Sequence, residues 1–99
     1  FTASSSPATI ASTQAALNCI RLQPELRLNL EKNFLALYNG LTDLGFRLGP
    51  EATPVIAVRM AESEAAFAGW KQLLEQGVYV NLVLPPATPD GSSMLRCSV

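Results

Sequence analysis

The residue with the clearest potential for chemistry is Arg96, in the C-terminal segment VYVNLVLPPATPDGSSMLRCSV, residues 78–99. It is the only charged residue in a short apolar run that follows a double proline. Side chains alternate between the two faces of a strand, so Arg96 shares one face with Met94 and Ser98. Leu95, Cys97 and Val99 point to the other face. A guanidinium beside a half-buried sheet needs a partner, because an unpaired buried charge costs several kcal/mol.

Two partners fit Arg96. One is an internal carboxylate, for which the sequence offers Glu51, Glu62 and Asp90. The other is an anionic ligand, because the planar guanidinium binds a carboxylate or phosphate better than a lysine does. The residues alone do not decide between these two readings.

The loop LPPATPD, residues 84–90, also has two readings. Proline-rich loops serve as recognition peptides or as rigid spacers. This loop joins two predicted core strands, which favours a rigid loop that shapes the rim of a site.

The sequence lacks the residues needed for several common kinds of active site. The sequence has no histidine, which excludes a Ser-His-Asp triad, and no glycine-rich phosphate loop. Its two cysteines, without histidine or a CxxC motif, are too few for a zinc site. We interpret the remaining candidates as solvated surface charges, so we expect no catalytic residue and no metal in this chain; they are Glu62, Glu64, Glu75, Lys32 and Lys71.

Composition restricts the function further. Ninety-nine residues suffice for one domain at most, and 48% hydrophobic content supports a real core. Seven basic and eight acidic residues nearly cancel, which gives no electrostatic case for nucleic acid. No apolar run is long enough to span a bilayer, and no secretory signal is visible. We expect a cytoplasmic protein with reduced, buried thiols at Cys19 and Cys97. Because the chain opens on Phe1 and closes inside a predicted strand, we interpret it as a piece of a longer protein.

Two helices are predicted in the first half. Ser6 and Pro7 are typical of a helix start, and the helix should end near Arg21. Pro24 opens the second helix, which Gly45 should terminate. Its apolar stripe repeats every three or four residues, at Leu26, Leu30, Phe34, Leu37, Leu41 and Leu44.

The second half alternates strands with one helix. We predict strands at Val55–Met60, Val78–Leu84 and Met94–Val99. Between the first two, a helix should begin at residues 62–64 and stop at Gly77. Its predicted apolar face consists of Ala66, Phe67, Trp70, Leu73 and Leu74. The fold class is therefore α+β, a small mixed or antiparallel sheet of about three strands with helices on one face.

Two separated stretches resemble signatures of the α-oxoamine synthases. They are the opening FTASSSPATIASTQAAL and the closing YVNLVLPPATPDGSSMLRCSV. Members of this family are pyridoxal 5′-phosphate (PLP) enzymes of fold type I that condense an amino acid with an acyl-CoA. The resemblance implies that residues 1–20 end the large domain and form a helix at a homodimer interface. Residues 21–99 would be the C-terminal small domain, incomplete at its C-terminus.

The resemblance also implies roles for single residues. Arg96 corresponds to the arginine that binds the carboxylate of the amino-acid substrate. Thr2 and Ser4 correspond to the segment that approaches the cofactor phosphate of the partner subunit. Pro85, Pro86, Ala87 and Thr88 would form the mobile edge of the substrate entrance, with Ala87 and Thr88 as the substrate contacts.

The chain departs from the family at two points. Many members carry an arginine just before the double proline, where this chain has Leu84. The Schiff-base lysine of the family lies upstream of Phe1, so the resemblance implies that these 99 residues are inactive alone. For the parent enzyme it implies condensation of serine with a long-chain acyl-CoA to a 3-ketosphinganine-type product.

Two other classes of function stay open. A stand-alone module of this size could bind a small molecule or regulate an enzyme. A pure association domain would also fit, because the first two helices would expose apolar surface without partners.

Overall fold

The computed structural model describes residues 3–99, which fall into two compact units. One unit ends at Leu30 and the other comprises Glu31–Val99. The division falls inside the second helix and concerns only this chain. The predicted boundary between large and small domains, after residue 20, stays a prediction.

The first unit contains helix α1, Pro7–Leu22, close to the predicted limits. Ser6 caps it as expected, because its side chain accepts a hydrogen bond from the backbone N–H of Thr9 at 3.2 Å. Pro7 occupies the first turn, where its missing N–H leaves no helical bond unmade. No residue of α1 is buried. This helix therefore contributes no residue to a buried core in its own unit.

Helix α2, Pro24–Asp43, begins at the predicted proline and ends just before Gly45. Gly45 has φ 88°, and the N–H of Phe46 donates to the carbonyl of Leu41 at 3.1 Å. This left-handed turn satisfies carbonyl groups that the helix end leaves free, and only glycine adopts it at little cost.

The predicted apolar stripe of α2 is only partly used. No residue of α2 is buried, and Leu44 is 76% exposed. Leu41 of the stripe does pack against the core, but its neighbour there is Tyr38, which the stripe did not include. Tyr38 also donates its hydroxyl to the carbonyl of Gly49 at 2.7 Å. A phenol can cover apolar surface and still bond to the turn, which a leucine cannot do.

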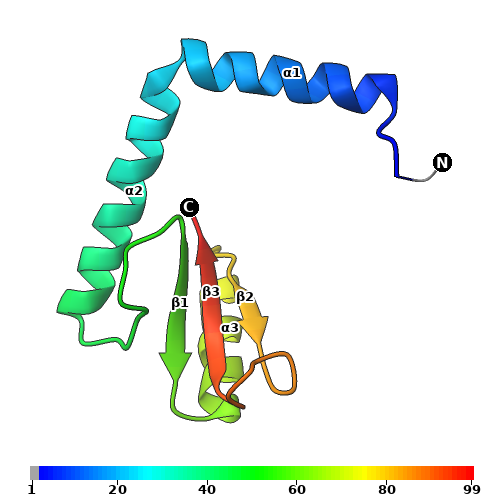
Figure 1. The fold of residues 1–99 in the computed structure, drawn as a ribbon. Coiled ribbons are helices and arrows are strands. Elements are labelled where there is room, and N and C mark those ends of the chain that lie inside the picture. Colours follow the sequence, from blue (N-terminus) through cyan, green and yellow to red (C-terminus); the bar gives the residue numbers. More distant parts are fainter. Residues whose placement is uncertain (1–2) are drawn as a thin grey trace. The chain divides into compact units, whose positions relative to one another are not determined.

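The sheet has three strands, β1 (Val55–Met60), β2 (Asn81–Val83) and β3 (Ser93–Ser98), in the order β1-β3-β2 (Figure 1). Both pairings with the central strand β3 are antiparallel, which confirms the α+β prediction. An isolated antiparallel bridge pairs Arg59 of β1 with Arg47, which lies outside the three strands.

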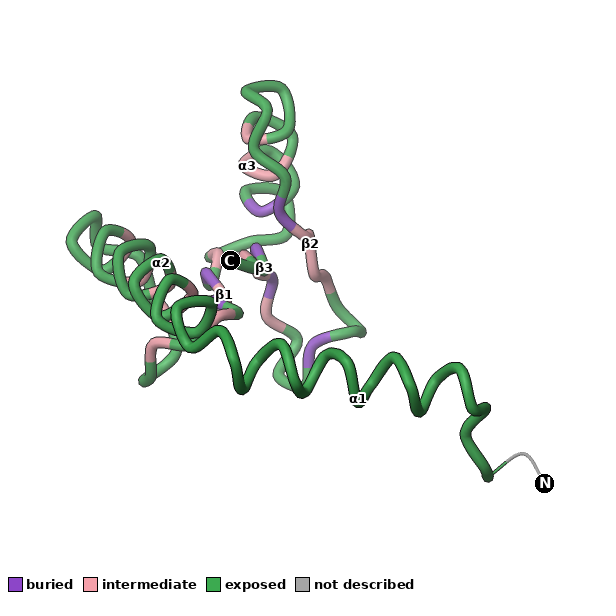
Figure 2. Tube along the Cα trace, turned by 90° about the horizontal axis from the view of Figure 1, so that it is seen from above, coloured by how far each residue is buried: buried purple, intermediate pink, exposed green. Residues whose placement is uncertain are grey.

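Helix α3, Ser63–Glu75, contacts all three strands and covers one face of the sheet. The core lies between them, and the buried positions gather on the strands and the start of α3 (Figure 2). Trp70 and Leu73 of α3 pack against it as predicted, whereas Phe67 is 50% exposed. The core cluster consists of Ile56, Val58, Val80 and Leu95.

Strand β2 is shorter than the predicted Val78–Leu84. Its first residues bond to helix α3 instead of to a strand. The N–H of Val78 donates to the carbonyl of Leu73 at 2.8 Å, and the indole N–H of Trp70 donates to the carbonyl of Val80 at 3.1 Å. These bonds tie down the backbone before ladder pairing begins at Asn81.

The two cysteines are free thiols. Cys97 is half-buried, and burial raises the pKa of its thiol. Cys19 is exposed, so the expectation of two buried thiols is wrong for this residue. The reason is that no described residue of its unit covers the α1 surface on which it lies. Within residues 3–99, no helix has the length and apolar character needed to cross a membrane.

Candidate functional site

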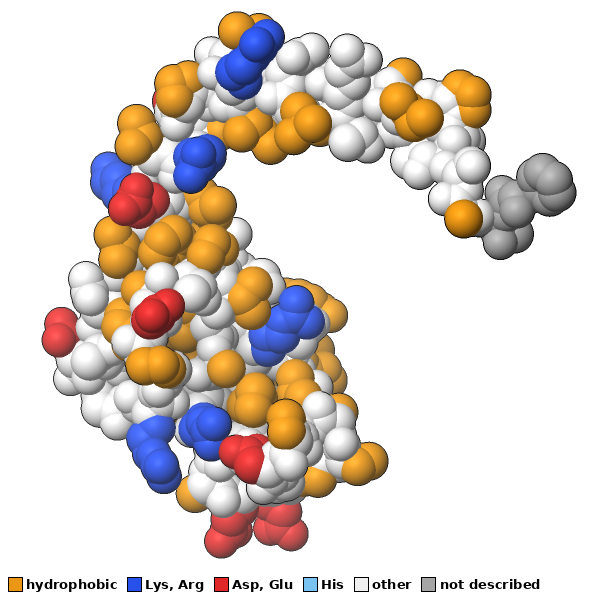
Figure 3. All heavy atoms as spheres, viewed as in Figure 1, with side chains coloured by type: hydrophobic (Ala, Val, Ile, Leu, Met, Phe, Trp, Pro, Cys, Tyr) orange, Lys and Arg blue, Asp and Glu red, His pale blue; other side chains and the backbone are white. Residues whose placement is uncertain are grey.

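Arg96 lies on the face of the sheet that α3 leaves uncovered. The register pairs Arg96 with Ala57 of β1 and Asn81 of β2, so it is central in a row of three. Leu95 and Val58, one position along, belong to the opposite face and form the core. Arg96 itself is exposed. Figure 3 shows this open side, where basic side chains lie among apolar ones over the sheet.

None of the three proposed internal carboxylates pairs with Arg96. Among residues 3–99 the only ion pair joins Arg59 to Asp90, with 2.8 Å between Nη1 and Oδ2. Glu51 and Glu62 make no ion pair in this part of the chain. The guanidinium of Arg96 therefore stays available to an anion from outside the described residues, which is the second of the two readings.

The loop between β2 and β3 is built around Asp90. Its Oδ1 accepts hydrogen bonds from the hydroxyl of Ser92 at 2.6 Å and from the N–H of Ser92 at 3.1 Å. These two bonds, followed by the one from Arg59, lower the pKa of Asp90 from 3.8 to about 2. The carboxylate is therefore ionised over the whole physiological range.

Two predicted substrate contacts lie in this loop, in different surroundings. Ala87 is exposed, as are Pro85 and Pro86 before it. Thr88 is only 6% exposed, and its hydroxyl donates to the carbonyl of Ser92 at 2.7 Å. Thr88 therefore braces the loop from inside, and its donor proton is already engaged. Whether either residue contacts a substrate stays a prediction.

The predicted cofactor contacts belong to the start of the chain. Thr2 lies outside the described residues. Ser4 is an exposed residue before α1, in the unit that does not contain Arg96. Its role stays a prediction as well.

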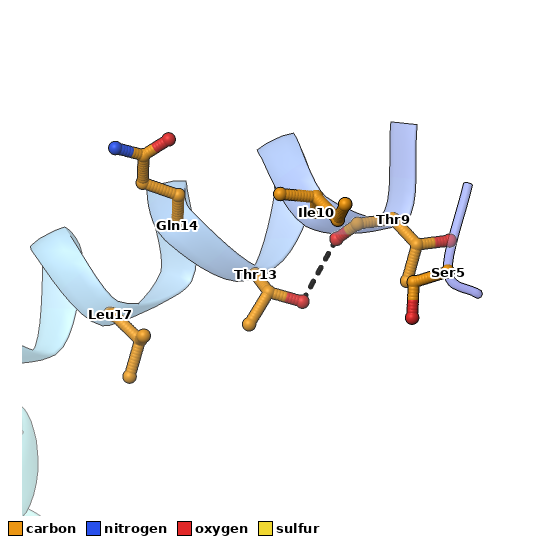
Figure 4. Close-up of a pocket in the computed structure, with 6 residues that line it drawn as sticks. All are labelled: Ser5, Thr9, Ile10, Thr13, Gln14 and Leu17. Atoms are coloured by element: carbon orange, nitrogen blue, oxygen red, sulfur yellow. Dashed lines mark hydrogen bonds between the residues drawn. The ribbon is translucent and has the colours of Figure 1, made fainter. Parts of the chain in front are cut away.

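Helix α1 carries a surface pocket along one of its faces (Figure 4). Two polar residues of the pocket bond within the helix, because the hydroxyl of Thr13 donates to the carbonyl of Thr9 at 2.9 Å. Ile10 and Leu17 supply exposed apolar surface, at 56% and 62% exposure. The pocket is lined by Ser5, Thr9, Ile10, Thr13, Gln14 and Leu17.

Two contacts near the site escaped the sequence analysis. Arg59 was not predicted to take part in the site. Its ion pair with Asp90 occupies one of the carboxylates that had been considered as a partner for Arg96. The hydroxyls of Ser63 and Ser93 lie 2.7 Å apart and join the start of α3 to the start of β3. Both contacts link positions about 30 residues apart. Only the strand register brings them together, so no local sequence pattern indicates them.

Lysines and metal ligands do not contribute to this site. Lys32 on α2 and Lys71 on α3 are both exposed, as predicted. No group of His, Cys, Asp and Glu among residues 3–99 could hold a metal ion.

Over its full length the chain is similar to known proteins of the α-oxoamine synthase family. No family model matches it. It is 54% identical over 99 residues to a serine palmitoyltransferase of Caulobacter vibrioides, covering 100% of this chain and 24% of the relative. It is 34% identical over 101 residues to an 8-amino-7-oxononanoate synthase of Trichlorobacter lovleyi, covering 100% of this chain and 26% of that enzyme.

The fold agrees with a solved structure. The serine palmitoyltransferase K265A from S. paucimobilis, with bound PLP–myriocin aldimine, superposes with a TM-score of 0.87 at 40% identity. The match covers 100% of this chain and 25% of that one. The chain thus spans about a quarter of the length of its relatives and is homologous over its full length to a segment of the α-oxoamine synthases. Its fold matches the C-terminal domain of serine palmitoyltransferase structures.

Proposed function

We propose that this chain supplies the carboxylate-binding part of a serine palmitoyltransferase. The parent enzyme condenses serine with a long-chain acyl-CoA, releasing CO₂ and CoA and giving a 3-ketosphinganine-type product. The observation that carries the proposal is the exposed guanidinium of Arg96, which makes no ion pair with any described residue and lies in the middle of the uncovered sheet face.

Arg96 holds the carboxylate of the amino acid. A guanidinium donates two parallel N–H bonds to the two oxygens of a carboxylate, which fixes the orientation of the substrate as well as its position. Because β3 is the central strand, its backbone is bonded on both sides, to β1 and to β2. The base of the side chain is therefore rigid, as a substrate-positioning group requires.

PLP, when bound in the parent, supplies an electron sink that stabilises a carbanion at the α-carbon of the amino acid. The described residues do not fit its covalent attachment, since Lys32 and Lys71 are both exposed on the surfaces of helices α2 and α3. The anchoring lysine comes from a part of the parent that precedes these residues. The chain alone is therefore inactive.

The remaining predicted contacts complete the site. By the resemblance, Thr2 and Ser4 would hold the cofactor phosphate of the partner subunit in a homodimer, through hydrogen bonds that their hydroxyls can donate. Ala87, which is exposed in the loop between β2 and β3, borders the substrate entrance together with Thr88. The exposed apolar side chains of α1, among them Ile10 and Leu17, supply dimer contacts.

A direct assay tests the proposal. The full-length protein is incubated with serine and palmitoyl-CoA, and CoA release is followed with a thiol reagent. We expect serine-dependent CoA release by the full-length protein and none by the 99-residue chain. Absence of CoA release with every amino acid tried would refute the enzymatic function. Measurable amino-acid affinity of the 99-residue chain alone would favour a stand-alone binding module.

A further inference from the structure

We infer that Arg59 and Asp90 are positioning residues, which hold the loop between β2 and β3 in place and keep the amino-acid carboxylate directed to Arg96. The first part of this inference, the fixed loop, rests on contacts within the described residues. The second part rests on the proposed function. Neither residue touches the substrate in this account.

Among residues 3–99, a single side-chain hydrogen bond joins the loop to another strand of the sheet. Arg59 belongs to β1, whereas residues 84–92 connect β2 to β3. Its Nη1 donates to Oδ2 of Asp90 at 2.8 Å. Within residues 3–99, every other side-chain hydrogen bond of this loop stays inside the loop. Loss of the Arg59 contact therefore removes the one side-chain hydrogen bond between this loop and β1 in residues 3–99.

Asp90 transmits this contact into the loop. Its two oxygens have separate partners, Arg59 on Oδ2 and Ser92 on Oδ1. The carbonyl of Ser92 in turn accepts from the buried hydroxyl of Thr88 at 2.7 Å. A continuous series of hydrogen bonds thus runs from β1 to the residue beside Ala87. Such a linked set holds a loop better than one exposed ion pair does.

The same pair sets the charge next to Arg96. Arg59 pairs with Met94 in the register, two residues before Arg96 on the same face of β3. Both arginines therefore point to the uncovered side of the sheet. With Asp90 bound, Arg59 is neutralised, and Arg96 is the free guanidinium of the pair. Without Asp90, two free guanidinium groups would compete for one carboxylate.

The experiment uses the full-length protein with four variants: Asp90→Asn, Arg59→Gln, the double variant, and Arg59→Lys. Asp90→Asn keeps the shape of the side chain and both groups are exposed, so these variants should fold. Arg47→Gln is the matched control, because Arg47 bridges to Arg59 only through backbone atoms and makes no side-chain hydrogen bond or ion pair in the described chain. Far-UV circular dichroism checks the fold of each variant.

The first readout is hydrogen exchange of backbone amides in residues 84–92. The amides of Ala87, Gly91 and Ser92 donate hydrogen bonds inside the loop. We expect them to exchange about two- to fivefold faster in Asp90→Asn and Arg59→Gln, the effect of losing a partly exposed ion pair. The double variant should be no faster than the faster single one, since both remove the same contact. Unchanged exchange rates in both single variants would refute the inference that Arg59 and Asp90 hold this loop in place.

The second readout is steady-state kinetics. We expect the KM for serine to rise about two- to fivefold in Asp90→Asn and Arg59→Gln, while the KM for palmitoyl-CoA stays within twofold. Arg59→Lys should raise the KM for serine less than Arg59→Gln does. Only one N–H donor of Arg59 contacts Asp90, and the lysine ammonium can replace it. Faster exchange with unchanged KM for serine would overturn the link to Arg96. If the unsubstituted protein shows no condensation, the proposed function fails, and the exchange data still decide whether the loop is fixed.

Discussion

Arg59 and Asp90, 31 residues apart in the sequence, form the one ion pair found in residues 3–99, and Arg96 is thereby left without an internal carboxylate. Both arginines belong to the same face of the sheet, as the pairing of Arg59 with Met94 shows. One is engaged in holding a loop and the other is free. This division of roles is the basis for interpreting Arg96 as a ligand-binding residue.

The ionisation of Asp90 should make the unfolding free energy of the chain depend on pH in the acid range. Its pKa is about 2 in the folded chain against 3.8 for the free side chain. A lowered pKa means that folding favours the ionised form, so this contribution is complete above about pH 3.8. It is lost as the pH falls from about 3.8 towards 2. Urea unfolding of the 99-residue chain at a series of pH values measures it.

The control for this acid dependence is Asp90→Asn, which cannot titrate. The difference in unfolding free energy between the unsubstituted chain and this variant should shrink between about pH 3.8 and 2 and stay constant at neutral pH. A difference that is constant across the acid range would contradict the pKa assigned to Asp90.

Leu95 should be a major source of stability. It is 6% exposed and belongs to the core cluster on the face of β3 opposite Arg96. We expect Leu95→Ala to cost about 2–5 kcal/mol of unfolding free energy, because it removes apolar contacts and leaves a cavity. Leu44→Ala, at a site 76% exposed, should change it by less than about 0.5 kcal/mol. Urea unfolding followed by Trp70 fluorescence compares the two. Equal effects would show that the core is elsewhere.

The 99-residue chain should self-associate through α1. Four of its apolar side chains are exposed: Ile10, Leu17, Ile20 and Leu22, at 56%, 62%, 49% and 71%. Exposed apolar surface of this kind marks association sites. We expect light scattering to show oligomers, and replacement of Ile10 and Leu17 by glutamine to weaken association at least about tenfold. Leu44→Gln serves as control. A monomer at high concentration would rule out this role of α1.

Local sequence signals predicted the elements well. Ser6 with Pro7, Gly45 and Gly77 mark helix limits through backbone geometry that depends on neighbouring residues alone. The strand Val55–Met60 was also predicted with the limits observed. Contacts between distant residues were harder to predict. Tyr38 packs on the core and donates its hydroxyl to the carbonyl of Gly49, and the carbonyl of Val80, just before β2, accepts from the indole N–H of Trp70.

The candidate site shows the same limit. Strand alternation alone predicted the face on which Arg96 lies. The sequence could not predict that Arg96 makes no ion pair with a described residue, because Asp90 was one of its possible partners. In the structure Asp90 pairs with Arg59 instead. The helices on one face of an α+β sheet follow from amphipathic patterns, whereas the pairing of charges depends on the full three-dimensional arrangement.

The most direct test is the KM for serine of the full-length protein with Arg96→Gln and Arg96→Lys. Hydrogen bonds between charged groups contribute about 1.5–3 kcal/mol, so Arg96→Gln should raise the KM for serine about 10- to 150-fold. Lysine keeps the charge but not the two-pronged geometry, and should give an intermediate value. Arg47→Gln should stay within twofold of the unsubstituted enzyme. A KM for serine that Arg96→Gln leaves within twofold, in a folded and active enzyme, would contradict the account.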